Sequence, residues 1–235
     1  MTQLSIEATD LSVRFKDRLL FHIPNLVLGP RDAVYLSGDN GVGKTTLLKV
    51  LSGLQRPTTG SLNINKPSVL RRLFCAQSNN GVIYMHQTPY MFDGTVLDNV
   101  CYGLKFTVRE RRNRRTEAIN ALRMVGLETL ADEHISVLSG GERQRVAMAR
   151  AWVIKPAVLL MDESSASLDQ ESTDRLVILC KDLLSRGTSL VITSHQKNAL
   201  TDLCRRQWTI SDSQLIERAD LQLVDEDNNK YAYAG

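Results

Sequence analysis

The chain has 235 residues, of which 43% are hydrophobic and 23% are charged, and its formal net charge is +3 at pH 7. This composition is typical of an ordinary soluble globular protein and excludes a disordered or fibrous chain, and the small net charge gives no indication of a nucleic-acid partner. At this length the chain can bury a sizeable core, and we expect a single compact unit with subdomains.

Signals for targeting and for cross-linking favour a cytosolic chain. The first ten residues contain neither the basic nor the apolar segment of a signal peptide, and the most apolar run, residues 157–161, is far too short to cross a bilayer. The cysteines form no C-x-x-C pair, so neither a zinc knuckle nor a disulfide framework is indicated; they are Cys75, Cys101, Cys180 and Cys204. Any role at a membrane would depend on a partner.

The N-terminal part predicts strands, then a glycine-rich loop and a helix. Residues 4–15 and 33–37 alternate or cluster apolar side chains over strand-like lengths, and GPRD at 29–32 is typical of a turn. Residues 41–54 then place leucine and valine at helical spacing, with Gly53 where a C-terminal cap would stand.

Residues 95 to 155 predict a helical insert. Three segments carry charged, helix-favouring sequence, namely 95–104, 108–127 and the segment from 138 that stops at Lys155-Pro156. The second contains a basic run at 109–115, which we interpret as a solvated helix face rather than an interaction patch.

The chain after Pro156 alternates strand and helix patterns. AVLLMDE and SLVITSH are apolar runs of strand length, and the segment between them, 173–187, has apolar residues at helical spacing. This alternation predicts a mostly parallel sheet wrapped by helices.

GDNGVGKT at 38–45 matches the phosphate-loop pattern G-x-x-x-x-G-K-[ST], and it lies where such a loop must lie, between a strand and a helix. Glycines let successive backbone N–H groups turn inward, and the helix dipole adds partial positive charge there. Lys44 would reach the β- and γ-phosphates, and Thr45 would offer its hydroxyl to Mg2+. The alternative is a glycine-rich turn that only caps a helix.

Polar side chains end three of the apolar runs. Asp162 and Glu163 follow the strand at 158–161, so one can hold magnesium while the other polarises water; an exposed acidic strand end is the alternative. His195 and Gln87 end two other runs, where ligands of parallel sheets bind. Each of these two is weak evidence by itself.

LSGGERQRVAMARA at 138–151 has a structural and a functional interpretation. Ser139 and Glu142 match the S-x-x-E capping box, and a stripe of apolar residues follows at helical spacing. A cap does not require the consecutive glycines Gly140 and Gly141, which each cost about 1 kcal/mol relative to alanine. They suggest that something approaches the backbone closely.

The ordered motifs GDNGVGKTT, HQ, LSGGERQ, LLMDE, SLD and SH resemble those of the nucleotide-binding subunit of an ABC transporter. The resemblance extends from Phe15 to His195, and LSGGERQ is its most specific element. It implies ATP and Mg2+ as cofactors, with catalytic roles for Glu163, His195 and Gln87, metal ligation by Thr45, Gln87 and Asp162, and nucleotide contacts from Phe15, Gly38, Asn40, Gly41, Gly43, Lys44, Thr45, Thr46, Ser139, Gly140, Gly141 and Asp169.

Within that resemblance the residues have distinct roles. Glu163 would be the general base for the attacking water, His195 would contact the γ-phosphate, and Asp169 would couple two subunits. Phe15 would stack on adenine, and a core phenylalanine is its alternative. The chain departs from the common family pattern in SSASLD at 164–169 and in SHQ at 194–196. Neither change removes a charged or metal-binding group, so we expect hydrolysis to be retained.

The resemblance also implies the fold and the partners. We expect an α/β P-loop NTPase fold, RecA-like with a mostly parallel sheet and flanking helices, an N-terminal antiparallel portion, and a helical subdomain at about 95–155 within one ATPase domain over 1–235. A second copy would close the LSGGERQ turn over the γ-phosphate. A groove beside Gln87 would accept a transmembrane permease, which holds the chain at the cytoplasmic side of the membrane, and an extracytoplasmic solute-binding protein would complete the system.

Three functional hypotheses remain at this stage. The first is a bacterial importer subunit, for a small anion such as tungstate, molybdate or phosphate. The second is a soluble ABC ATPase that acts in assembly or scaffolding. The third, a plain P-loop kinase or GTPase, is disfavoured because it leaves LSGGERQ without a purpose.

Overall fold

A computed structural model describes residues 4–65, 81–105, 111–164 and 168–219. In these ranges a single nine-stranded sheet runs through the molecule in the order β4-β1-β2-β9-β8-β3-β7-β6-β5. The strands are β1 (Ser5–Phe15), β2 (Arg18–Leu28), β3 (Ala33–Ser37), β4 (Thr59–Asn65), β5 (Val82–Met85), β6 (Val158–Met161), β7 (Ser189–Thr193), β8 (Arg206–Ser211) and β9 (Gln214–Ala219).

The sheet has a parallel part and an antiparallel part. Strands β8, β3, β7, β6 and β5 pair in parallel with one another in that order, whereas β4, β1 and β2 pair antiparallel with one another. Strand β9 joins the two parts, because it pairs antiparallel with β8 and parallel with β2. The predicted combination of a parallel sheet and an N-terminal antiparallel portion is therefore confirmed. Strands β2 and β4 and the β8–β9 hairpin are additional to the strands that the sequence patterns predicted.

Helices and short turns connect these strands. Gly53, with φ of 77°, ends the first helix as predicted. Three helices lie between β5 and β6 in the chain, in the segment that predicted a helical insert. The helices are α1 (Lys44–Leu51), α3 (Val96–Leu104), α4 (Arg111–Met124), α5 (Gly140–Ile154) and α6 (Gln170–Ser185), with 3-10 turns at Glu128–Leu130, Ile135–Val137 and Thr201–Leu203.

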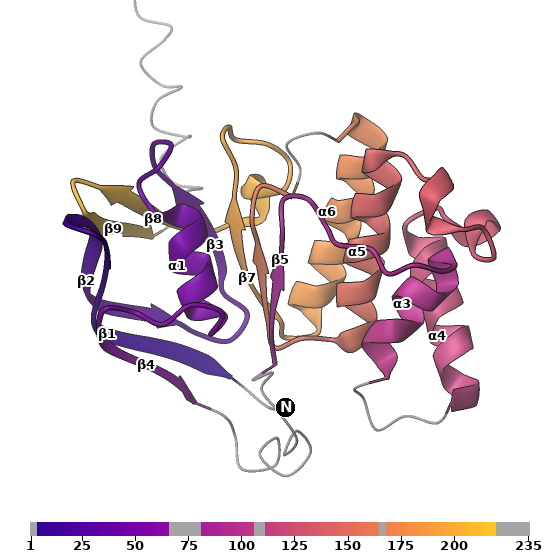
Figure 1. The fold of residues 1–235 in the computed structure, drawn as a ribbon, viewed down its shortest axis with the longest axis horizontal. Coiled ribbons are helices and arrows are strands. Elements are labelled where there is room, and N and C mark those ends of the chain that lie inside the picture. The colour runs from indigo at the N-terminus through magenta and orange to yellow at the C-terminus, as the bar shows by residue number, and fades with distance from the viewer. Residues whose placement is uncertain (1–3, 66–80, 106–110, 165–167, 220–235) are drawn as a thin grey trace, which may run out of the picture.

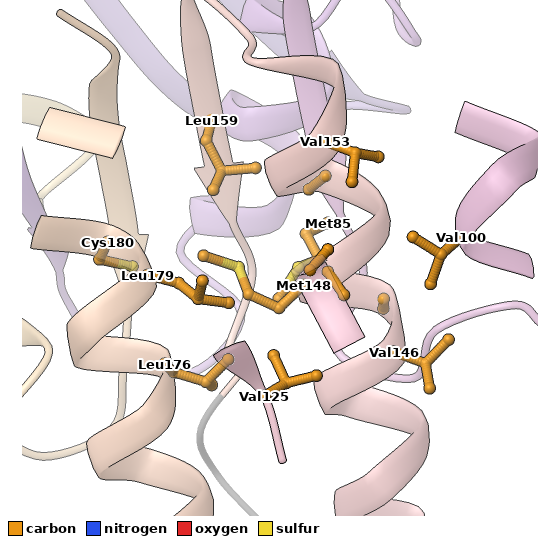
Figure 2. Packing of buried hydrophobic residues seen from close by; sticks show 14 of the residues in the cluster. Met85, Val100, Val125, Val146, Met148, Val153, Leu159, Leu176, Leu179 and Cys180 are labelled. Atoms are coloured by element: carbon orange, nitrogen blue, oxygen red, sulfur yellow. The ribbon is translucent and has the colours of Figure 1, made fainter. Parts of the chain in front are cut away.

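The central strands are buried on both faces, which explains their unbroken apolar sequences. Leu159 and Met161 of β6 face one hydrophobic cluster, while Val158 and Leu160 face the other. The first cluster lies under α3, α4, α5 and α6, where Met148 packs among side chains from several elements (Figure 2). The second is formed by residues of α1, the antiparallel strands and the other face of the central strands, and Figure 1 shows α1 between these two groups of strands. Alternating residues of one strand thus join two cores.

Three expectations from the sequence concern membrane-spanning segments, the cysteines and the basic run at 109–115. In the described part of the chain no helix is both long and apolar enough to span a membrane. The described cysteines, Cys101, Cys180 and Cys204, are free thiols, and Cys75 lies outside the described residues. Within the basic run, Asn113 and Arg115 are exposed on α4, as a solvated helix face requires.

Candidate functional site

The glycine-rich loop joins β3 to α1, and two of its glycines are required by the surrounding chain. Gly38 has φ of 139°, and a Cβ there would lie 2.6 Å from the carbonyl oxygen of Ile210. Gly43 has φ of 109°, and a Cβ there would lie 3.0 Å from the Phe21 ring. Gly41 also has a positive φ of 78°, but a Cβ at this position would meet open space. Local packing therefore explains Gly38 and Gly43, and backbone conformation explains Gly41.

Lys44 folds back onto this loop. Its ammonium group donates to the carbonyl oxygens of Gly38, at 2.7 Å, and Asp39, at 2.9 Å, and only 7% of the residue is exposed. Thr45 is exposed and Thr46 is half-buried in the first turn of α1, and Asn40 is exposed in the loop. Gly43 caps α1 without a side-chain hydrogen bond. The N–H groups of this helix start are therefore available to an anion.

Asp162 follows β6, and hydroxyl groups hold both of its carboxylate oxygens. Tyr84 of β5 donates to Oδ2 at 2.7 Å, and Thr193 of β7 donates to Oδ1 at 3.0 Å. The carboxylate is almost fully buried, with 5% of the residue exposed. Burial, the hydrogen bond to Asp162 and the charge of that carboxylate raise the pKa of the Tyr84 hydroxyl, so Tyr84 remains a donor at neutral pH.

Glu163 and His195 meet at the ends of β6 and β7. Nε2 of His195 lies 2.9 Å from Oε2 of Glu163. The Glu163 backbone adopts the left-handed region, with φ of 47°, which is uncommon for a residue other than glycine. Its N–H donates to the Thr193 hydroxyl at 2.8 Å. The structure thus brings together a carboxylate and an imidazole that are far apart in sequence.

The parallel strands place the predicted residues along one edge of the sheet. Because β3, β7, β6 and β5 are parallel neighbours, the segments that follow them lie in a row. This row holds the glycine-rich loop, His195, the Asp162–Glu163 pair and Gln87, which is exposed two residues beyond β5. Such an edge is where ligands bind in parallel α/β sheets.

Phe15 and Asp169 lie outside this row. Phe15 ends β1 and is 69% exposed, so the alternative of a core phenylalanine is wrong. Asp169 is the N-cap of α6, where it accepts from the Ser172 N–H at 2.8 Å. The hydrogen bonds from Ser172 lower the pKa of the Asp169 carboxyl. Residues 165–167 of the predicted SSASLD segment lie outside the described residues.

The turn at Ser139 has the expected capping box. Oε2 of Glu142 accepts from both the N–H and the hydroxyl of Ser139 at 2.8 Å, and the Ser139 hydroxyl accepts from the Glu142 N–H at 3.3 Å. The turn lies on α5, and Figure 1 shows α1 and α5 on opposite sides of β5 and β7. The two glycine-containing helix starts of one chain are therefore not brought together.

Nothing in the described part of the chain explains the glycines of this turn. Neither Gly140 nor Gly141 has a positive φ. A Cβ at Gly140 would meet nothing within 4 Å, and one at Gly141 would be in ordinary contact with the Ser172 hydroxyl, at 3.6 Å. Alanine would fit at both positions and would favour the helix by about 1 kcal/mol each.

Two site residues, Tyr84 and Thr193, were missed by sequence reasoning. Each is a hydroxyl residue in an apolar strand, and this was the only sequence signal available. The sequence predicted a groove beside Gln87. The structure has a cavity of about 550 Å³ whose lining includes Thr88, the residue after Gln87, but not Gln87 itself. It is lined by Thr88, Pro89, Tyr90, Met91, Asp93, His134, Ile135, Ser136 and Arg143.

The donor set suits a magnesium nucleotide better than a resident metal ion. Among the described residues, no group of three or more histidine, cysteine, aspartate or glutamate side chains could hold a metal ion. Mg2+ commonly takes one or two protein oxygens and completes its shell with substrate phosphates and water. Asp162, Thr45 and Gln87 supply oxygens of that kind along the sheet edge that also carries the phosphate loop.

Comparison with known proteins gives one family. The sequence profile described as ABC transporter matches residues 21–166. The chain is 33% identical over 236 residues to the methionine import ATP-binding protein MetN 1 of Lactiplantibacillus plantarum, covering 95% of this chain and 65% of the relative. It is 31% identical to the methionine import ATP-binding protein MetN of Helicobacter hepaticus, covering 85% of this chain and 58% of the relative. The chain thus spans less than two thirds of the length of these relatives.

Solved structures show the same fold. An ATP-binding subunit of an ABC transporter matches with a TM-score of 0.79 and 18% identity, over 97% of this chain and 95% of the other. A dimeric, post-hydrolysis ATP-binding cassette bound to ADP and Pi matches with a TM-score of 0.75 and 24% identity, over 91% of this chain and 98% of the other.

Proposed function

Because the chain belongs to the ABC transporter family, we propose that it binds and hydrolyses ATP in order to drive a separate permease. The single observation that carries this proposal is the row of groups along one sheet edge: the phosphate loop, the Glu163–His195 pair at 2.9 Å and the buried Asp162. In this proposal residues 1–235 form one ATPase domain, with a helical subdomain at about 95–155.

The chain's own groups have separate tasks in hydrolysis. The N–H groups of the loop and α1, with Lys44, would bind the phosphates, which would compete with the Gly38 and Asp39 carbonyls for the ammonium group. Glu163 would accept a proton from water as the oxygen attacks the γ-phosphorus and the bond to the β-phosphate breaks. His195 would contact the γ-phosphate and orient this carboxylate. Mg2+, held by Asp162, Thr45 and Gln87, would neutralise developing phosphate charge.

A second copy of the chain would complete each site. No described residue of their own chain requires Gly140 and Gly141 to be glycine, whereas a phosphate that approaches the start of α5 would need the bare backbone. Since the phosphate loop of the same chain lies across the molecule (Figure 1), the phosphate would be bound by another copy. Two identical sites would each use the loop of one chain and the Ser139 turn of the other. Phe15 would stack on the adenine, and Asp169 would couple the two subunits at their contact.

The cavity beside Gln87 is the proposed permease contact. It combines exposed aromatic surface, since Tyr90 is 72% exposed, with the charged side chains of Asp93 and Arg143. A permease bound there would hold the chain at the cytoplasmic face of the membrane, and an extracytoplasmic solute-binding protein would deliver the solute.

The substrate class is less closely defined than the activity. The relatives named above are methionine import proteins, so the comparisons favour solute import over a soluble assembly factor. They give no support to the tungstate, molybdate or phosphate hypothesis. We therefore propose import of a small solute, with methionine as the first to be tested.

Substitution of Glu163 tests the proposed hydrolysis. Glu163→Gln should retain nucleotide binding and reduce turnover by at least about a hundredfold, because general base catalysis typically contributes that much. Glu171→Gln is a matched control, since Glu171 pairs with Arg175 on the surface of α6. Steady-state release of phosphate measures turnover, and fluorescent ATP titration measures binding. Hydrolysis by Glu163→Gln at the parent rate would contradict the assigned role.

A further inference from the structure

Thr193 is a buried hydroxyl at the end of β7 that no expectation assigned. It is 0% exposed and follows Ile192, which pairs with Met161 of β6. This register places the threonine beside the two acidic residues that leave β6. Its Oγ1 lies 2.8 Å from the Glu163 nitrogen and 3.0 Å from Oδ1 of Asp162.

The donor count fixes the direction of both bonds. A threonine hydroxyl has one hydrogen and two lone pairs. The Glu163 N–H must donate to the oxygen, and the Asp162 carboxylate must accept the hydroxyl hydrogen. The Met161 carbonyl, at 3.3 Å, is the more distant acceptor. One hydroxyl therefore holds the backbone of Glu163 and the side chain of Asp162 together.

This contact compensates for an unfavourable conformation. Glu163 has φ of 47°, which non-glycine residues adopt only when their surroundings impose it. The bond from its N–H to Thr193 is an interaction that stabilises this conformation. The same conformation directs the carboxylate toward His195, at 2.9 Å. Tyr84 holds the opposite oxygen of Asp162 at 2.7 Å, so the aspartate is clamped from two strands.

We infer that Thr193 and Tyr84 are positioning residues that set Glu163 and Asp162 in their working orientations. This inference rests on the proposed ATPase function. Neither hydroxyl contacts the reacting atoms in this account. They act through the two carboxylates.

Two isosteric substitutions separate positioning from folding. Thr193→Val removes the hydroxyl at nearly constant volume. Thr188→Val is the matched control, because Thr188 is 3% exposed and donates to the Pro156 carbonyl at 2.7 Å, between the same two strands at their opposite end. Thr193→Ser restores the hydroxyl and should recover most of the lost activity.

The expected result has two independent readouts. Thr193→Val should lower kcat by at least about tenfold, as loss of a hydrogen bond to a charged group would, with little change in ADP affinity. The Glu163 amide should exchange with deuterium at least about tenfold faster in this variant, measured by NMR without nucleotide, because its acceptor is gone. Thr188→Val should show neither effect.

The outcomes distinguish this inference from the proposed function. Parent-like kcat and parent-like Glu163 exchange in Thr193→Val would overturn the inference, even where Glu163→Gln abolishes turnover. Parent-like hydrolysis in Glu163→Gln would instead overturn the proposed function. If Thr193→Val does not fold, Tyr84→Phe tests the inference instead. Tyr84 is half-buried, and this variant removes only the hydroxyl that donates to Oδ2 of Asp162. Its kcat should fall by at least about threefold, and an unchanged kcat would reject the clamp.

Discussion

At the scale of single residues, the Ser139 turn carries a capping box at the same helix start where we propose an anion site. The capping box uses the N–H groups of Ser139 and Glu142. The N–H groups of Gly140 and Gly141 have no intrahelical acceptor, because they lie in the first turn of α5. Capping and phosphate binding are therefore compatible.

Glu142 makes the stability of this turn dependent on pH. Hydrogen bonds from the Ser139 backbone and side chain lower the pKa of the Glu142 carboxyl, so its ionised form favours the fold. Glu142→Ala should reduce the free energy of unfolding at pH 7 by about 1 kcal/mol, as loss of a cap does. Glu142→Gln should keep the capping geometry and lose less.

The sign of the pH effect follows from the lowered pKa. The stabilisation is complete above the ordinary glutamate pKa of about 4.3 and is lost as the pH falls through the lower folded-state pKa. The difference between parent and Glu142→Ala should therefore shrink below about pH 4, in denaturant titrations at several pH values. Glu133→Ala, at an exposed position, is the control. A difference that grows toward low pH would contradict the assignment.

At the scale of elements, Asn99 of α3 holds the loop that lines the proposed permease groove. It is fully buried, and it accepts from the Phe92 N–H at 2.8 Å and donates to the Phe92 and Thr95 carbonyls at 2.9 and 3.0 Å. Arg150 of α5 donates to the Tyr90 carbonyl of the same loop at 3.0 Å. The helix that begins with the Ser139 turn thus also supports the groove.

Removal of the Asn99 amide should loosen this loop. Asn99→Ala leaves the N–H and the carbonyl of Phe92 without this partner, while the Thr95 carbonyl keeps its bond from the Asn99 N–H at 3.2 Å. The free energy of unfolding should therefore fall by about 2 kcal/mol. Amide exchange at Phe92 should accelerate, as measured by NMR. Asn120→Ala, at an exposed position of α4, should change neither quantity. If the free energy of unfolding fell by less than about 1 kcal/mol and the Phe92 amide stayed protected from exchange, Asn99 would not be the residue that holds this loop.

Sequence patterns could locate the elements that carry the site, but not the contacts between them. The phosphate loop, the acidic strand end and the Ser139 cap each have a local pattern, so they could be predicted. Strand β2 pairs with the adjacent β1, but it contains Pro24, which argues against a strand. The β8–β9 hairpin is also local, but its sequence mixes polar and apolar residues without an apolar run, and β4 depends on pairing with the distant β1. The Thr193–Asp162 bond depends on the register of β6 against β7 and could not be seen before the fold.

At the scale of the whole molecule, the two proposed phosphate-binding helix starts are separated on one chain. The loop at α1 and the turn at α5 lie on opposite sides of the central strands (Figure 1). Each has exposed or half-buried residues at its start. A head-to-tail pair of chains would bring each loop against the other chain's turn, so association would be part of catalysis.

The mass of the Glu163→Gln variant in solution, with and without ATP, tests this claim most directly. Light scattering during size exclusion should give 26.3 kDa without ATP and twice that mass with ATP and Mg2+. Adding Ser139→Arg should leave ATP binding intact and keep the mass at that of one chain, since the arginine would occupy the phosphate position at α5. A variant that binds ATP but stays at 26.3 kDa, or a Ser139→Arg double variant that still doubles its mass, would contradict the shared-site account.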